Sequence, residues 1–180
     1  MTPKSQQTRS VKLSYLLRHK PEAAGLSIDK EGWVEVGELI AKTDFTEPEL
    51  KQIVADDEKS RYSFSADSMF IRANQGHSVS KVQMSFKQAS PKSQLFHGAD
   101  NKVLDEILKH GLKPMARHHV HLSADFETAV SVGARRKTGF TVLSIDAQAM
   151  AADKIKFYIS ENGVYLVDHV PPKYIHKATT

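Results

Sequence analysis

The apolar residues of this chain come in short runs, and their spacing changes from helical to alternating about a third of the way along the sequence. Three short helical patterns come first, in residues 8–20, 36–40 and 46–54, the last opened by a capping box at Thr46–Glu49. Alternating apolar residues over 62–71 then predict a hairpin. Three helices followed by a hairpin are typical of a winged helix, a fold that commonly docks on nucleic acid.

The limits of the first helix follow from its polar residues and a proline. Thr8 or Ser10 can cap its start, and Pro21 stops it, because the proline ring disfavours the helical conformation at the residue before it. Arg18 and His19 are therefore expected in its last turn.

A polar segment rich in Ser and Pro, Gln88–Gln94, is the best candidate for a linker, which predicts lobes of residues 1–88 and 89–180. In the second lobe, a helix over 100–111 is expected to turn Val103 inward. The remaining elements expected there are strands at 95–98, 120–123 and 140–145, a helix at 126–132 and a hairpin around Asn162–Gly163. The sequence therefore predicts an α+β protein whose second lobe is mostly mixed or antiparallel sheet.

The charges are arranged in blocks. Residues 1–21 hold five bases and no acid, residues 22–58 eleven acids and three bases, and residues 59–97 six bases and one acid. The two basic blocks can form one surface for a polyanion, or they can be solvated faces with no partner. The net charge of +4 does not decide between these two interpretations.

The composition excludes several classes of site. The chain has no cysteine, so disulfides, thiolate catalysis and thiolate zinc ligands are excluded. It has no apolar run of membrane-spanning length and its first ten residues are polar, so we expect no membrane span, no export and a cytoplasmic location. His119 and His121 would share a strand face, but no third ligand has suitable spacing, and no metal is expected. The glycine motifs of Rossmann, P-loop and hydrolase sites are absent, which does not exclude nucleotide binding.

A few basic and polar residues are candidates for phosphate recognition. Arg18 and His19 close an apolar helix, while Arg61 and Arg72 flank the hairpin. Arginine binds phosphate through two parallel hydrogen bonds, although basic residues at these places are also common on plain solvent-exposed surfaces. We expect the arginines to be exposed, so that alanine at Arg18 or Arg61 leaves the fold intact. The loop Gln75–Ser78 suits either a ligand contact or an ordinary turn.

Six separated segments resemble, in the same order, the family of NAD-dependent RNA 2'-phosphotransferases of the Tpt/KptA type. The resemblance spans nearly the whole chain. The segments are Leu13–His19, Glu58–Tyr62, Ile71–Ser78, Phe96–Gly98, Arg117–Ser123 and Val132–Arg135.

The resemblance implies a winged-helix RNA lobe joined to an ADP-ribosyltransferase-like lobe that binds NAD. It also implies the role of each site residue: a catalytic tetrad of Arg18, His19, Arg61 and Arg117, substrate contacts from Arg72, Gln75, His77 and Ser78, and an NAD site at His97, Gly98, His121, Leu122, Ser123, Gly133 and Arg135. Many relatives have Thr where this chain has Ala99, so the resemblance does not imply that this side chain contacts the nucleotide here. ADP-ribosyltransferases that modify proteins, which the second lobe resembles, often use a glutamate late in the fold. In the family that this chain resembles the corresponding position is apolar, and here it is Val164. Glu161 is therefore expected to be a turn residue.

The implied partners are NAD as co-substrate and an RNA with an internal 2'-phosphate of the tRNA-splicing type, with no metal and a monomeric protein. The implied reaction passes through an ADP-ribosylated RNA phosphate and yields 2'-hydroxyl RNA, nicotinamide and ADP-ribose cyclic phosphate. Two alternatives remain open: an ADP-ribosyltransferase that modifies phosphate ends of nucleic acid, and a non-enzymatic winged-helix protein that binds RNA or DNA.

Overall fold

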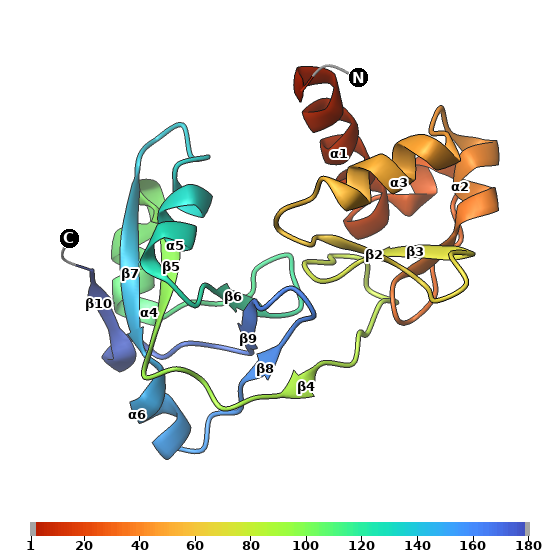
Figure 1. Ribbon diagram of the computed structural model, residues 1–180. Coiled ribbons are helices and arrows are strands. Elements are labelled where there is room, and N and C mark those ends of the chain that lie inside the picture. Colours follow the sequence, from red (N-terminus) through yellow and green to blue (C-terminus); the bar gives the residue numbers. More distant parts are fainter. Residues whose placement is uncertain (1–2, 179–180) are drawn as a thin grey trace. The chain divides into compact units, whose positions relative to one another are not determined.

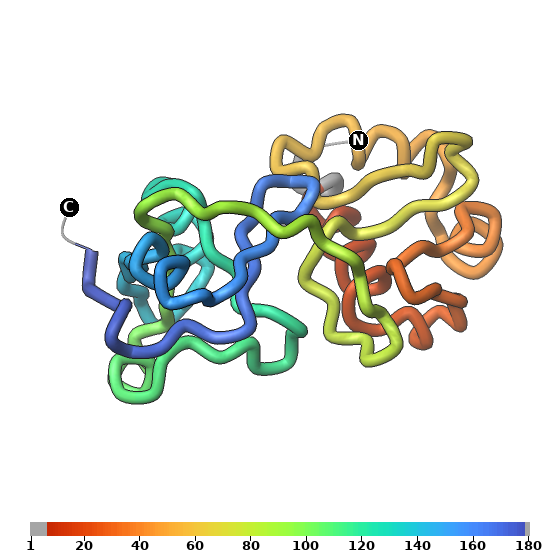
Figure 2. Tube along the Cα trace, turned by 90° about the horizontal axis from the view of Figure 1, so that it is seen from below, coloured from red at the N-terminus to blue at the C-terminus, as the bar shows by residue number. Residues whose placement is uncertain are grey.

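The computed structural model describes residues 3–178 and divides into two compact units, Met1–Ser85 and Phe86–Thr180 (Figure 1). The trace in Figure 2 shows the red-to-yellow part of the chain in one unit and the green-to-blue part in the other. Both units combine helices with antiparallel sheet, which confirms the α+β class. Within residues 3–178, no helix combines the length and apolar character that crossing a membrane requires.

Over residues 3–85, the first unit contains three α-helices and one three-stranded sheet. Its elements are α1 Pro3–Arg18, the 3₁₀ helix η1 Pro21–Ala24, β1 Trp33–Glu35, α2 Val36–Lys42, α3 Glu47–Ala55, β2 Tyr62–Phe64 and β3 Phe70–Ala73. The strand order is β1-β3-β2, so β3 is central. The three helices gather beside this sheet (Figure 1), and apolar side chains of all these layers form one core, including Leu13, Leu17, Leu39, Leu50 and Ile71.

The predicted helices and hairpin of this unit are confirmed, with two corrections. Helix α1 begins at Pro3 rather than at a cap on Thr8 or Ser10, because a proline is well tolerated in the first turn and no helix breaker follows it. The short strand β1 is the second correction, since it becomes a strand only by pairing with β3. The capping box forms as expected: Glu49 N donates to Thr46 Oγ1 at 3.4 Å, and Thr46 N donates to Glu49 Oε2 at 3.0 Å.

Part of the first basic block is neutralised by acidic residues of the next. Arg9 donates to Asp44 at 2.6 Å and to Glu49 at 2.9 Å, and Lys12 also pairs with Asp44. These hydrogen bonds, that of Lys12 first and then that of Arg9, lower the pKa of Asp44 to about 2. Arg9 also stacks on the Phe45 ring, 4.2 Å from its centroid. These two bases therefore anchor α1 to the segment before α3.

In the described part of the second unit, residues 86–178, there are two antiparallel sheets and three α-helices. Its elements are β4 Lys87–Gln88, β5 Gln94–Asp100, the 3₁₀ helix η2 Asn101–Val103, α4 Leu104–His110, β6 Val120–Leu122, α5 Phe126–Gly133, β7 Phe140–Asp146, α6 Ala147–Ala152, β8 Tyr158–Ile159, β9 Tyr165–Val167, the 3₁₀ helix η3 Pro172–Tyr174 and β10 Ile175–Lys177. The strand orders are β10-β7-β5 and β4-β8-β9-β6. Phe96 and Ser123 exchange backbone hydrogen bonds of 2.9 and 2.8 Å, which link β5 to the end of β6.

The strands at 95–98, 120–123 and 140–145, the helix at 126–132 and the hairpin around Asn162–Gly163 are all found, within a few residues. Strand β5 continues to Asp100, beyond the His97–Gly98 turn expected from sequence. Val103 was expected to face inward but is 47% exposed, because η2 and not α4 contains it and the helical register starts only at Leu104. The predicted linker begins inside β4, where Gln88 pairs with Tyr158 of β8, and Ala89 N donates to Phe157 O at 2.9 Å.

Candidate functional site

Arg18, at the end of α1, is only 8% exposed, which corrects the expectation of a surface arginine. Residues of the segment Ala73–Ser78 lie against it. Ser78 N donates to the Arg18 carbonyl at 2.9 Å. Gly76 has φ +87°, and a Cβ there would lie 3.7 Å from Arg18 Nη1. The chain therefore passes directly over the guanidinium.

His19 is tied to the same segment. Its Nδ1 lies 2.9 Å from the Ser78 hydroxyl, within hydrogen-bond distance. This contact fixes the plane of the imidazole and directs Nε2 to the opposite side of the ring. Ser78 thus positions both Arg18, through its backbone, and His19, through its side chain.

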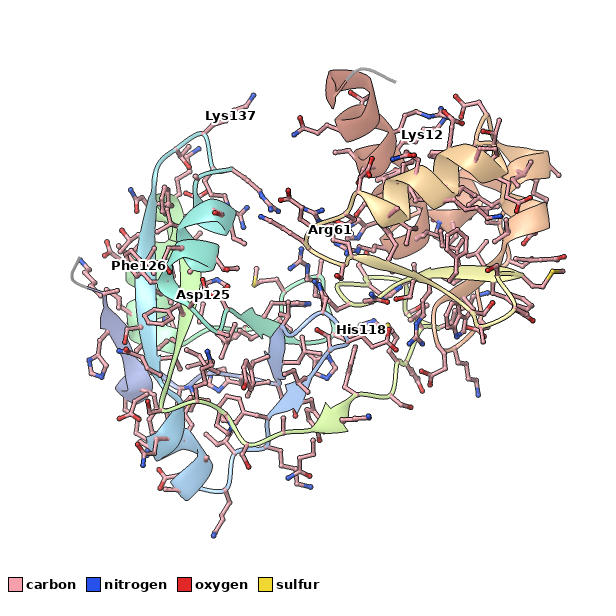
Figure 3. The ribbon with its side chains drawn as sticks, in the orientation of Figure 1. Lys12, Arg61, His118, Asp125, Phe126 and Lys137 are labelled. Carbon is pink, nitrogen blue, oxygen red and sulfur yellow. The ribbon has the colours of Figure 1, made fainter. Side chains whose placement is uncertain are left out.

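Arg61 lies in the loop between α3 and β2 (Figure 3). The Asp57 carboxylate accepts hydrogen bonds from the backbone N–H of Arg61 and from its Nη1. Asn74, which is 2% exposed, donates its backbone N–H to Arg61 O at 2.8 Å and its Nδ2 to Ser60 O at 2.8 Å. The segment Ala73–Ser78 is therefore bonded to the Arg61 loop at one end and to Arg18 and His19 at the other.

The other predicted substrate residues surround this segment. The Arg72 guanidinium stacks on the Trp33 ring at 4.4 Å and its Nη1 donates to Glu31 O at 3.5 Å. His77 is 4% exposed and packs on Gly32, where a Cβ would lie 2.9 Å from its Nε2. Gln75 is half-buried. Ser78 is in direct contact with a tetrad residue, since its hydroxyl lies 2.9 Å from His19 Nδ1.

In the second unit, His97 on β5 is held by the backbone of β6. Its Nδ1 lies 3.0 Å from His121 O, and because a carbonyl only accepts, Nδ1 carries the proton and donates it. Burial first, and then the positive charges of Arg136 and Arg117, lower the pKa of His97 against the opposing effect of this hydrogen bond. The ring is therefore neutral at physiological pH, with Nε2 as an acceptor.

Arg117 lies in the loop before β6, and its guanidinium is part of a cluster of cations. Partial desolvation of the guanidinium, and then the positive charges of Arg136 and Arg135, lower the pKa of Arg117. Every one of these contributions acts in the same direction, as expected for a cation among cations. Such a cluster is a favourable place for a phosphate or pyrophosphate, whose charge would relieve the repulsion.

The predicted glycines serve close packing between α5 and the strands. A Cβ at Gly98 would lie 2.6 Å from Ala129 O and 2.8 Å from Gly133 N, and a Cβ at Gly133 would lie 2.3 Å from Phe140 Cδ2. Helix α5 therefore packs directly against the backbone of β5 at Gly98, and this packing sets the position of Arg135 and Arg136 just after the end of the helix.

The segment His121–Ser123 contributes in three different ways. The His121 carbonyl holds His97. Leu122 is fully buried in the core, and Ser123 joins β6 to β5 through its backbone. His119 lies just before β6, with its Nε2 3.8 Å from Asp168 Oδ1, and across the described part of the chain no three metal-ligating side chains gather.

The neutral state of His97 predicts a loss of stability in mild acid. Because burial lowers its folded pKa below the unfolded value of 6.5, the unfolded chain takes up a proton that the folded chain does not as pH falls below 6.5. The free energy of unfolding should therefore fall between pH 7.5 and 5.5, and less so in His97→Gln. Urea unfolding of both proteins at each pH measures this; equal pH dependence in the two would contradict it.

Comparison with known proteins identifies the family. A model of the RNA 2'-phosphotransferase, Tpt1 / KptA family matches residues 4–169. The chain belongs to this family. A Fusobacterium nucleatum protein named "Probable RNA 2'-phosphotransferase" is 46% identical over 168 residues, covering 91% of this chain and 93% of the relative. Proteins of the same name from Acaryochloris marina (46%, covering 94% and 96%) and Nostoc punctiforme (47%, covering 92% and 93%) are equally similar.

The family match confirms the resemblance found in the sequence, and all predicted site residues lie within the matched range. The structure adds two residues that the sequence prediction did not include in the site, since Asp57 and Asn74 bind Arg61. Arg136, which the sequence pairs with Arg135 as a possible contact to a pyrophosphate, acts electrostatically on both His97 and Arg117. Asn74 and Arg136 adjoin predicted residues in the sequence, whereas nothing in the sequence separates Asp57 from its exposed neighbours Asp56 and Glu58.

Proposed function

We propose that this chain is an NAD-dependent transferase that moves an internal RNA 2'-phosphate, of the kind left at a splice junction, to NAD. Membership of the RNA 2'-phosphotransferase family carries the proposal. The arrangement of Ala73–Ser78, which contacts the Arg61 loop, Arg18 and His19, supports it. These three residues have the chemistry of a phosphate site.

We further propose that the first unit is a winged-helix RNA lobe and the second an ADP-ribosyltransferase-like NAD lobe. The element order α1-β1-α2-α3-β2-β3 with β3 central in the sheet supports the first assignment. In the second unit, neutral His97 offers Nε2 to a ribose hydroxyl, and the Arg135–Arg136 pair offers positive charge to the pyrophosphate.

The proposed reaction has two steps. A 2'-phosphate oxygen attacks the anomeric carbon of the nicotinamide ribose, and the bond to the nicotinamide nitrogen breaks with its electron pair. In the resulting ADP-ribosylated RNA, the 2'-hydroxyl of the ADP-ribose unit then attacks the phosphorus. The RNA 2'-oxygen leaves and gains a proton. The products are 2'-hydroxyl RNA, nicotinamide and ADP-ribose cyclic phosphate.

The residues match the demands of these steps. A phosphate is already anionic, so the first step needs no base and depends on positioning. In the second step Arg18, Arg61 and Arg117 stabilise the charge on the equatorial phosphate oxygens. His19, oriented by Ser78, assists the proton transfer from the attacking hydroxyl to the departing oxygen.

The test mixes the protein with NAD and a short RNA bearing one internal 2'-phosphate, and follows nicotinamide, RNA phosphate and the ADP-ribose product. Release of cyclic phosphate together with 2'-hydroxyl RNA is expected. The same RNA without the phosphate, and NADH in place of NAD, are the controls, and neither should react. Stable ADP-ribosylated RNA would favour a terminal ADP-ribosyltransferase, and RNA binding without nicotinamide release would favour a binding protein.

A further inference from the structure

We propose that Asp57 is a positioning residue that fixes the Arg61 guanidinium for the substrate phosphate. This inference rests on the proposed function, because Arg61 matters only if it contacts the phosphate. Asp57 itself would not touch the substrate.

The burial of Asp57 sets it apart from other acids nearby. Its side chain is 3% exposed, whereas that of Arg61 is 30% exposed. A buried carboxylate is costly unless it is paired and hydrogen-bonded. Each of its two oxygens accepts a hydrogen bond from Arg61, one from the backbone N–H and one from Nη1. The same carboxylate therefore holds both ends of one arginine.

Backbone hydrogen bonds also hold the loop that contains Asp57 and Arg61. Ser60 N donates to Asp57 O at 2.7 Å, and Ser60 adopts the left-handed conformation with φ +43°. Asn74 then binds the carbonyls of Ser60 and Arg61. Arginine has a long side chain whose rotamer freedom opposes a fixed geometry, and these contacts remove much of that freedom before substrate arrives.

The pair leaves the chemistry of the guanidinium intact. A guanidinium has five N–H donors, so the bond from Nη1 to Asp57 does not saturate it. Its partly exposed edge remains suited to a phosphate, which arginine binds through two parallel hydrogen bonds. Asp57 therefore determines where this edge points rather than how strongly it is charged.

Asp56 provides a matched control. It is adjacent to Asp57 but exposed, and its carboxylate accepts from Gln52 Nε2 at 2.6 Å. Asp56→Asn and Asp57→Asn make the same chemical change one residue apart. Only the second alters a contact of Arg61.

The experiment is a double-mutant cycle in the full-length protein with 2'-phosphorylated RNA and NAD. Asp57→Ala should lower kcat about 10- to 100-fold with KM for NAD unchanged. Asp57→Asn, which keeps one acceptor, should retain more activity, and Asp56→Asn should match wild type. In an Arg61→Ala background, Asp57→Ala should cause no further loss. An additional loss of full size there would overturn the inference, because Asp57 would then act independently of Arg61.

A second measurement does not depend on turnover. Rotation of the Arg61 guanidinium about its Nε–Cζ bond, followed by NMR, should be slow in wild type and Asp56→Asn and faster in Asp57→Ala, which has no side-chain acceptor. Unchanged rotation in Asp57→Ala would overturn the inference even if activity fell. If wild type turned over no RNA, the proposed function would fail, while this measurement would still report whether Asp57 holds Arg61.

Discussion

Arg117→Ala is expected to lower the turnover of 2'-phosphorylated RNA by about 10²- to 10³-fold, the usual effect of removing one donor that stabilises charge in a transition state. Arg117 is exposed and makes no contribution to the apolar core of the second unit. Removing it also relieves repulsion with Arg135 and Arg136. The folded state should therefore be unaffected, and the loss should be in kcat.

Lys137→Ala is the matched control for this change. Lys137 is an exposed cation in the loop after α5 (Figure 3), close in sequence to the arginine pair, and it is not assigned to the site. The two variants change the net charge equally. Steady-state kinetics and thermal unfolding of both proteins separate catalysis from charge and folding. Equal activity of Arg117→Ala and Lys137→Ala would remove Arg117 from the catalytic set.

Local sequence signals predicted the elements that depend on local interactions. The capping box at Thr46–Glu49 forms with both of its hydrogen bonds, since its partners are three residues apart. The hairpin of β2 and β3 and the turn at Asn162–Gly163 follow from local turn chemistry in the same way. Strand β1 was missed because only its pairing with β3, far along the chain, makes its three residues a strand.

In the site, too, local sequence signals did not predict contacts between residues that are far apart in the sequence. The resemblance identified Arg18, His19, Arg61 and Arg117 as a set, but residue types alone predicted an exposed Arg18, and the structure buries it under Gly76. Burial of a long charged side chain depends on tertiary packing, which the pattern of α1 does not reveal. The pairing of Asp57 with Arg61 is similar, because the acidic run that includes Asp56 and Glu58 reads as an ordinary solvated surface.

Gly98→Ala should produce the largest loss of stability, about 3 kcal/mol in the free energy of unfolding. The new Cβ would lie 2.6 Å from Ala129 O and 2.8 Å from Gly133 N. Both are backbone atoms of α5, so the contact cannot be relieved by turning a side chain. The helix must move away from β5, and the arginine pair that follows it must move as well.

Gly37→Ala tests whether this effect is specific to the contact. Gly37 lies in α2, where a Cβ would be 3.6 Å from Glu35 Oε1, an ordinary contact. Alanine in a helix is favoured over glycine by about 1 kcal/mol, so this variant should be slightly more stable than wild type. Urea unfolding without NAD measures both changes. If Gly98→Ala unfolded like wild type and changed only KM for NAD, Gly98 would serve the ligand directly and the close packing of α5 on β5 would not explain why a glycine stands there.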